Sequence, residues 1–252
     1  MIKILVSGLG NTGTEIVKCI NETEGLKVLC AVSNYDLKDA DFKIYSDFNN
    51  VKDQEESVDV IIDFSKASRL EEILCYALKT KTPIVIGTTG HTHEQNQKIK
   101  EASKFIPIFK SSNTSIGITV MLQLVKTATR LLDGYDIEII EKHHNRKEDC
   151  PCGTAYMTAD IIKEVRNELT NIYGRHGKNA KRQPNELGIH TIRGGTIIGD
   201  NDVIFAGDDE VLEIKHRAGS NMIFAKGAVM AAKFIFDLEN GLYDMNDLLL
   251  GQ

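Results

Sequence analysis

The sequence lacks an excess of charge of either sign. Its 252 residues include 30 Lys and Arg against 36 Asp and Glu, a formal net charge of −6, and the two signs are mixed along the chain. The chain therefore offers no single-sign field of the kind that holds a nucleic acid or an anionic membrane surface. We expect no nucleic-acid partner. The length suits one large domain or two interleaved ones.

Long apolar runs are also missing. No stretch approaches the ~20 consecutive apolar residues that a membrane-spanning helix needs. The first ten residues, MIKILVSGLG, contain a short apolar run that ends in glycines, without the longer apolar region and cleavage site of a signal peptide. We therefore expect no membrane association and a cytoplasmic location.

Cysteine occurs only five times, at the irregular positions 19, 30, 75, 150 and 152. An odd number at such spacing does not describe a disulfide framework and agrees with a reducing compartment. Cys19, Cys30 and Cys75 lie within apolar patterns, so we expect all three in the core as small apolar residues. No low-complexity tract or tandem repeat is visible.

The first half of the chain predicts a parallel sheet. An apolar strand at 2–6 runs into a glycine turn and then into apolar residues at helical spacing, and a strand at 26–32 completes a βαβ unit. Further strands are expected at 58–64, 82–90 and 106–113, separated by helical patterns that end near residue 78 and at 94–104. Five strands alternating with helices predict an α/β fold with a doubly wound, Rossmann-like sheet.

Beyond Asn113 the pattern changes to α+β. We expect a helix at 117–132, a strand at 135–144 and, after a polar loop, a helix at 153–169. Three strand-like runs follow at 187–195, 196–207 and 210–219, and short turns such as Gly199–Asp202 suggest antiparallel pairing. The last helix, at 221–238, could return to the first sheet.

The glycine turn Gly8-Leu9-Gly10-Asn11-Thr12-Gly13 follows a strand and opens a helix. In that setting the glycines allow the backbone to approach a pyrophosphate, which then meets the free N–H groups of the helix N-terminus. The turn therefore predicts dinucleotide binding. A carboxylate after the second strand would favour NAD and an Arg would favour NADP, but Ser33-Asn34 stands there with Asp36 slightly late. The sequence therefore does not decide between NADH and NADPH as the cofactor.

Two polar turns follow the later strands of the predicted sheet. Gly87-Thr88-Thr89-Gly90 and Ser111-Ser112-Asn113-Thr114 lie just after the fourth and fifth strands. A doubly wound sheet holds its ligand at this carboxyl edge. Both turns could line a nicotinamide pocket, or each could be a plain turn.

The segment EIIEKHHNRKEDCPCGTAY, residues 138–156, allows three interpretations. A metal site would use His143, His144, Cys150 and Cys152, but the spacing differs from the usual zinc motifs, and neighbouring residues leaving a strand point to opposite faces. We therefore predict no metal. A charged, solvated rim is the second interpretation, because acids and bases run from Glu141 to Asp149.

The third interpretation is a receptor for a carboxylate. Gly153-Thr154 opens a helix directly after Pro151, a few residues from two histidines and a lysine. A helix N-terminus binds anions, and a nearby cation completes such a site. His and a partly desolvated Lys are suited to proton transfer beside it. This interpretation is favoured because the loop ends on the Gly-Thr helix start.

The same segment resembles the signature H-H-x-x-K-x-D-x-P-x-G-T-A of the 4-hydroxy-tetrahydrodipicolinate (dihydrodipicolinate) reductases. Here the signature spans His143 to Ala155. The resemblance covers essentially the whole chain. Its other markers are the glycine turn, Asp63-Phe64-Ser65, the Gly87 turn, Asn113 with Ser115-Ile116-Gly117, Ile192-Arg193-Gly194-Gly195 and Phe224-Ala225 before Gly227-Ala228.

The resemblance implies NADH- or NADPH-dependent reduction of a cyclic imine dicarboxylate in the diaminopimelate/lysine pathway, with release of water. It implies a dinucleotide-binding domain of residues 1–114 with 222–252, and a mixed-sheet domain of residues 115–221 that binds substrate and assembles a homotetramer. His143 would be the proton donor and acceptor and Lys147 the catalytic proton donor. The implied substrate-binding residues are His144, Gly153 and Thr154. The implied cofactor contacts are Gly8, Leu9, Gly10, Asn11, Thr12, Gly13, Gly87, Thr88, Thr89, Ser111, Ser112, Asn113 and Thr114.

Three departures from the family pattern bear on the site. Cys152 stands where many members have Ser, and a thiol is the weaker hydrogen-bond partner. Many members have one more residue in the glycine turn. An acid-Arg pair often follows their second strand, where this chain has Ser33-Asn34.

Two other functions compete with the reductase. A semialdehyde dehydrogenase would use Cys150 or Cys152 as a nucleophile, and a redox-sensing regulator would bind the dinucleotide without chemistry. Arg193 and Arg217, on late strands, could face the substrate or a subunit interface, and a surface or interface position is favoured.

Overall fold

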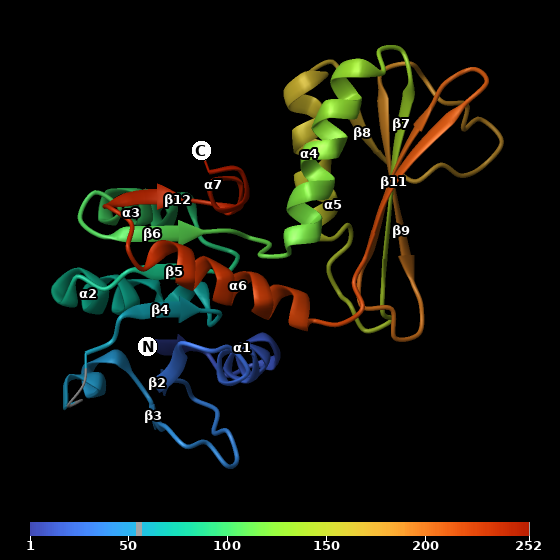
Figure 1. Ribbon diagram of the computed structural model, residues 1–252. Helices are drawn as coiled ribbons and strands as arrows, with labels where there is room; N and C mark the ends of the chain where they lie inside the picture. Colours follow the sequence, from blue (N-terminus) through green and yellow to red (C-terminus); the bar gives the residue numbers. More distant parts are fainter. Residues whose placement is uncertain (54–56, 252) are drawn as a thin grey trace. The chain divides into compact units, whose positions relative to one another are not determined.

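The computed structural model describes residues 1–53 and 57–251, and the predicted domain end at residue 252 lies outside them (Figure 1). The chain folds into two compact units. The first unit is formed by Met1–Ile116 together with Asn221–Gln252, and the second by Gly117–Ser220. No helix in the described part of the chain is long and apolar enough to cross a membrane.

The first unit contains a parallel sheet of seven strands in the order β12-β6-β5-β4-β1-β2-β3. From β1 the chain proceeds outward through β2 and β3 and then returns to the other side of β1 at β4, so the sheet is doubly wound as predicted. The strands are β1 Ile2–Ser7, β2 Leu26–Val32, β3 Lys43–Tyr45, β4 Val60–Asp63, β5 Ile84–Ile86, β6 Pro107–Lys110 and β12 Gly241–Tyr243.

Helices cover both faces of this sheet. On one face, α1 (Asn11–Asn21) and α6 (Met222–Ile235) pack on strand residues such as Ile4 and Val6. On the opposite face, α2 (Leu70–Thr80) and α3 (His93–Ala102) pack on Leu5 and its neighbours. Alternate residues of each strand thus enter different cores, which explains why the strands are nearly all apolar. The short α7 (Met245–Leu250) and the 3-10 turns η1 (Phe48–Asp53) and η2 (Ala67–Arg69) complete the unit.

Cys19 and Cys30 are buried in these cores, but the expectation for Cys75 was wrong. Helix α2 buries Leu70, Ile73, Leu74 and Ala77, and Cys75 lies on its outer, exposed side. An apolar neighbourhood in the sequence did not distinguish the two sides of this amphipathic helix.

The second unit contains a mixed sheet in the order β11-β10-β7-β9-β8, with α4 (Ile116–Leu131) and α5 (Gly153–Val165) packed on one face (Figure 1). Its strands are β7 Asp136–His143, β8 Thr170–Tyr173, β9 Glu186–Arg193, β10 Asp200–Ala206 and β11 Val211–Arg217. Strands β10 and β11 form the expected antiparallel pair, but β9 does not pair with β10 because β7 lies between them, parallel to β9.

The predicted turn at Gly199–Asp202 was also wrong, because residues 200 to 202 belong to β10. All three are buried polar side chains with partners: Asp200 is paired with Arg217, Asp202 with Lys142, and Asn201 lies near the Cys152 thiol. Buried polar groups that are paired can stay within a sheet, so their turn-like composition was misleading.

Candidate functional site

The turn between β1 and α1 requires its glycines. Gly8 has a φ of +90°, and a Cβ added to Gly13 would lie 1.9 Å from the Gly8 carbonyl oxygen. Helix α1 therefore starts against the end of β1. Gly10 caps the helix without a side-chain hydrogen bond, so the first N–H groups of α1 have no intrahelical acceptor and can bind an anion.

Leu9 differs from its neighbours in this turn. Its side chain is buried, and its N–H donates to Ser33 Oγ at 3.3 Å. Among the residues of the predicted phosphate turn, Leu9 therefore stabilises the loop rather than offering a free donor.

A cavity of about 300 Å³ lies beyond the carboxyl ends of the strands in the first unit. Eight of the residues expected to contact the cofactor line it together: Thr12, Gly87, Thr88, Thr89, Ser111, Ser112, Asn113 and Thr114. Phe64, Ser65 and Phe224 complete the lining. The expected residues Gly8, Leu9, Gly10, Asn11 and Gly13 are not in the lining but form the turn and helix start next to Thr12.

Buried hydrogen bonds fix the shape of this cavity. The Asp63 carboxylate accepts from Thr88 Oγ1 at 2.6 Å and from Ser65 Oγ at 2.5 Å, which ties two lining loops together. Burial raises the pKa of Asp63 above its ordinary value despite these hydrogen bonds. Thr114 Oγ1 donates to the Phe224 carbonyl at 2.8 Å, so α6 is joined to the third loop.

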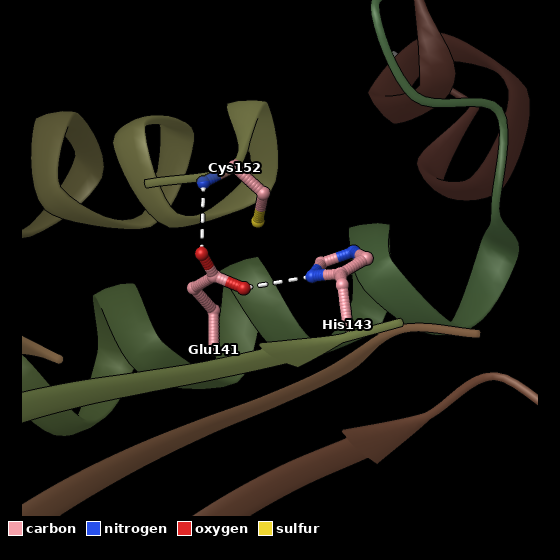
Figure 2. Close-up of side chains that lie close together, drawn as sticks. All are labelled: Glu141, His143 and Cys152. Carbon is pink, nitrogen blue, oxygen red and sulfur yellow. Dashed lines mark hydrogen bonds and ion pairs between the residues drawn. The ribbon is translucent and has the colours of Figure 1, made fainter. Parts of the chain in front are cut away.

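In the second unit, β7 places two side chains on the face that the helices cover. Glu141 and His143 continue the alternation of the buried Ile137 and Ile139, and Glu141 is fully buried. Figure 2 shows Glu141 between His143 and the start of α5. His143 Nδ1 lies 2.7 Å from Glu141 Oε2, and the Cys152 N–H donates to Glu141 Oε1 at 3.2 Å.

Arg193 neutralises the buried carboxylate. Its two terminal nitrogens donate to both oxygens of Glu141 at 2.8 Å, and Nη2 also donates to the Asp149 carbonyl. Burial would raise the pKa of Glu141, but the hydrogen bonds from His143 and Arg193 lower it to about 2. Of the positions expected for Arg193, the structure supports the one that faces the site, because β9 pairs with β7 and sets Arg193 opposite His143 and against the buried Glu141.

The ionised Glu141 determines which ring nitrogen of His143 carries a proton. Because a carboxylate only accepts, Nδ1 of His143 carries a proton, and Nε2 is the nitrogen left to exchange one. Nε2 lies close to the chain at Gly199, where an added Cβ would be 3.1 Å away. The absence of a side chain at position 199 leaves room for the imidazole.

The loop after β7 holds the other expected groups. Lys147 Nζ is paired with Asp149 Oδ1 at 2.6 Å, and the hydrogen bond from Lys147 lowers the pKa of Asp149. The His144 Nδ1 atom is buried and has no hydrogen-bond partner within the described residues. The loop is anchored to the β9 end by hydrogen bonds from Asn145 N to Gly195 O and from Gly194 N to His143 O.

Helix α5 begins at Gly153 with Cys152 as its N-cap, directly above Glu141 (Figure 2). Gly153 and Thr154 thus occupy the first two positions of α5, at the N-terminus of the helix. The fully buried Glu141 contradicts the interpretation of the whole segment as a solvated rim. The pairing of Glu141 with Arg193 was missed because only the pairing of β7 with β9 brings the two residues together.

Glu141, His143 and Cys152 each offer a possible ligand atom, and these atoms lie within 4.8 Å of one another. The arrangement favours hydrogen bonding over a metal, because the Arg193 guanidinium already occupies both carboxylate oxygens. Burial also raises the pKa of the Cys152 thiol, which disfavours the thiolate that a metal or a nucleophilic mechanism needs.

Comparison with known proteins agrees with this geometry. The family description "Dihydrodipicolinate reductase, N-terminus" matches residues 2–114, and "Dihydrodipicolinate reductase, C-terminus" matches residues 117–249. The chain is 46% identical to a 4-hydroxy-tetrahydrodipicolinate reductase of Caldanaerobacter subterraneus subsp. tengcongensis, covering 99% of this chain and 98% of the relative. A relative of the same name from Clostridium tetani is 44% identical to the chain, covering 99% of this chain and 97% of the relative.

Solved structures share the fold. A dipicolinate-bound dihydrodipicolinate reductase from Paenisporosarcina sp. TG-14 has a TM-score of 0.81 at 22% identity and covers 99% of both chains. A probable dehydrogenase from Thermotoga maritima has a TM-score of 0.61 at 12% identity, covering 99% of this chain and 94% of that one. On the sequence matches, which span nearly its whole length, this chain belongs to the dihydrodipicolinate reductase family.

Proposed function

We propose that the protein is an NADH- or NADPH-dependent 4-hydroxy-tetrahydrodipicolinate reductase of the diaminopimelate/lysine pathway. The observation that carries the proposal is the group of residues His143, Lys147, Gly153 and Thr154, which runs from the end of β7 to the start of α5 in a chain whose full-length relatives bear this name. The substrate is a small cyclic imine dicarboxylate.

The first unit fits a nicotinamide cofactor. Its glycine turn allows close approach of a pyrophosphate, and its cavity at the carboxyl ends of β4, β5 and β6 is lined by hydroxyl, amide and backbone groups. A bound nicotinamide supplies a hydride to an electron-poor carbon of the substrate ring.

Substrate binding is assigned to the second unit. The N–H groups at Gly153 and Thr154 would bind a substrate carboxylate, as helix N-termini do. His144 would contribute a further hydrogen bond, and its buried, unpaired Nδ1 supports that role. The Arg193 guanidinium offsets the charge of Glu141, which would otherwise repel a carboxylate at the start of α5.

Lys147 and His143 would supply the proton that balances the added hydride, while the ring hydroxyl leaves as water. Glu141 keeps the proton of His143 on Nδ1 and directs Nε2 to the exchange. The pairing of Lys147 with Asp149 positions the ammonium group in the same loop. Orienting the substrate against these donors would account for much of the rate.

We also propose that the protein is a cytoplasmic homotetramer assembled through the second unit. Exposed apolar side chains on that unit, Ile192, Val211 and Leu212, support self-association.

The test measures cofactor oxidation with enzymatically generated substrate, with NADH and NADPH in parallel. We expect activity in the wild type and a loss of at least about 100-fold in turnover when His143 and Lys147 are both replaced by Gln, since acid-base groups contribute about 10²–10⁴-fold. Circular dichroism and the affinity for the dinucleotide should stay unchanged in this variant, because neither residue lies in the unit that contains the cofactor cavity. Near wild-type turnover of the double variant would refute the assignment.

A cysteine-dependent semialdehyde dehydrogenase is disfavoured at Cys152, whose thiol is buried with a raised pKa. Cys150 is exposed. Alkylation of Cys150 therefore separates the two enzymes: the reductase should retain its activity and a thiol-dependent dehydrogenase should lose it.

A further inference from the structure

The end of β2 is where a doubly wound sheet selects between NAD and NADP. The group that contacts the adenosine ribose follows the glycine turn by about 20 residues. In this chain that position holds Asn34, just beyond the end of β2 at Val32. Neither a carboxylate for the ribose hydroxyls nor an arginine for a 2′-phosphate is adjacent in the sequence.

The fold brings an arginine to this position from another element. Arg69, the last residue of η2, donates through Nη2 to Asn34 Oδ1 at 3.4 Å and to the Ser46 carbonyl at 2.5 Å. Its guanidinium therefore lies between the residues that follow β2 and β3. Asn34 and Arg69 are 35 positions apart in the sequence, which is why no local motif revealed the pair.

In the described part of the chain, Arg69 hydrogen-bonds only to neutral groups. Within residues 1–53 and 57–251, both hydrogen bonds of Arg69 go to neutral oxygens through Nη2, and no carboxylate is paired with it. This distinguishes it from Arg193 and Arg217, at the ends of β9 and β11, which pair with Glu141 and Asp200. The guanidinium keeps donors for a further, anionic acceptor.

Ser33 fixes the backbone at Asn34 relative to the glycine turn. Its buried Oγ accepts from Leu9 N at 3.3 Å and from Tyr35 N at 2.9 Å, on either side of Asn34. A dinucleotide whose pyrophosphate is bound by the turn would therefore have its adenosine ribose near Asn34 and Arg69.

We propose that Arg69, together with Asn34, binds the 2′-phosphate of the adenosine ribose, so that the protein prefers NADPH to NADH. This inference rests on the proposed function, because it assumes a nicotinamide dinucleotide on the glycine turn. Arginine presents a planar set of donors that matches phosphate oxygens. A ribose without the phosphate would leave this cation unpaired.

The experiment is calorimetric titration of the wild type and of Arg69→Gln with NADPH, NADH, 2′,5′-ADP and 5′-AMP. We expect the wild type to bind 2′,5′-ADP at least about tenfold more tightly than 5′-AMP, and Arg69→Gln to lose about tenfold or more in affinity for NADPH and 2′,5′-ADP, the scale of one charge-assisted contact. Affinity for NADH should change less than about twofold.

A matched control removes a charge elsewhere. Lys79→Gln alters the exposed last turn of α2 without touching Asn34, so it should leave all four affinities unchanged. Equal losses in Arg69→Gln and Lys79→Gln would show a general charge effect and overturn the inference. Equal losses for NADPH and NADH in Arg69→Gln would overturn it as well.

A second variant keeps the inference testable if Arg69→Gln folds poorly. Asn34 is exposed, so the Asn34→Asp variant should fold. Its new carboxylate beside Arg69 should lower the affinity for NADPH and leave the affinity for NADH unchanged. Unchanged selectivity would contradict the inference. If neither dinucleotide binds the wild type, the proposed function fails with it, whereas tight NADPH binding that is insensitive to both variants refutes only the role of Arg69.

Discussion

Glu141 is an ionised side chain at a fully buried position, and its environment explains how it stays charged. Two hydrogen bonds from Arg193, one from His143 and one from the Cys152 N–H surround the carboxylate. Breaking such a buried pair by removing one partner generally costs more than the pair contributes as a whole. The second unit is therefore stabilised by Glu141 only while this carboxylate is ionised.

This linkage predicts a loss of stability in acid. The pKa of Glu141 is lowered from an ordinary 4.5 to about 2 in the folded protein, so its contribution is present above pH 4.5 and is lost as the pH falls through about 2. The shift corresponds to about 3 kcal/mol in the free energy of unfolding. Urea unfolding of the wild type and of Glu141→Gln should show a difference that shrinks by about this amount between pH 5 and pH 2.

The Glu141→Gln variant is the control for the other acids, because the amide side chain that it introduces does not titrate while all remaining carboxylates still do. If the two stability curves ran parallel through this pH range, the charged state of Glu141 in the folded protein would be disproved.

At the scale of elements, one glycine determines how closely α6 approaches the loop that lines the cavity of the first unit. A Cβ at Gly227 would lie 1.7 Å from the Thr114 carbonyl oxygen. Gly227→Ala must therefore displace α6 from the loop that lines the cavity. We expect a loss of about 1–3 kcal/mol in the free energy of unfolding, together with weaker NADPH binding, measured by urea unfolding and by titration.

Gly219 provides the matched control for this substitution. A Cβ there meets nothing within 4 Å, and its φ is not in the left-handed region. Gly219→Ala should leave both measurements unchanged. If the Gly227→Ala variant were as stable as Gly219→Ala, the close approach of α6 to Thr114 would not be needed for stability.

The sequence predicted the elements with long or regular patterns and missed those without one. Strand β2 coincides with the expected range 26–32, and α4 begins and ends within one residue of its prediction. Strands β3 and β12 have three residues each and show no usable alternation. Helix α5 ends at Val165 instead of 169, because the chain leaves the helical conformation at Arg166 and forms β8 four residues later.

The site was predictable only as far as its residues are contiguous. His143, Lys147, Gly153 and Thr154 fall within one short segment with a recognisable pattern, so the sequence indicated them as a group. Glu141 with Arg193, and Asn34 with Arg69, become neighbours only through strand order and loop placement. Such partners depend on pairings between distant segments, which local patterns do not encode.

At the scale of the whole molecule, the proposed cofactor and substrate sites lie in different units. Saturating NADPH should therefore slow hydrogen exchange most strongly in the glycine turn and in the loops at 87–89 and 111–114, which surround the cavity of the first unit. Bound ligand suppresses the openings that exchange requires. Mass spectrometry with and without NADPH tests this expectation, and protection confined to residues 141–155 would contradict it.

The first unit is assembled from two stretches of chain that flank the second, and this has a consequence for synthesis. Helix α6 supplies Ala225, Ala228, Ala232 and Ile235 to the core that also contains Ile4 and Val6. A nascent chain that has reached residue 220 has all of the second unit but leaves that face of the sheet without α6. Because α6 is synthesised only after the whole of the second unit, one face of the amino-terminal sheet stays partly uncovered until residues 222–235 have left the ribosome.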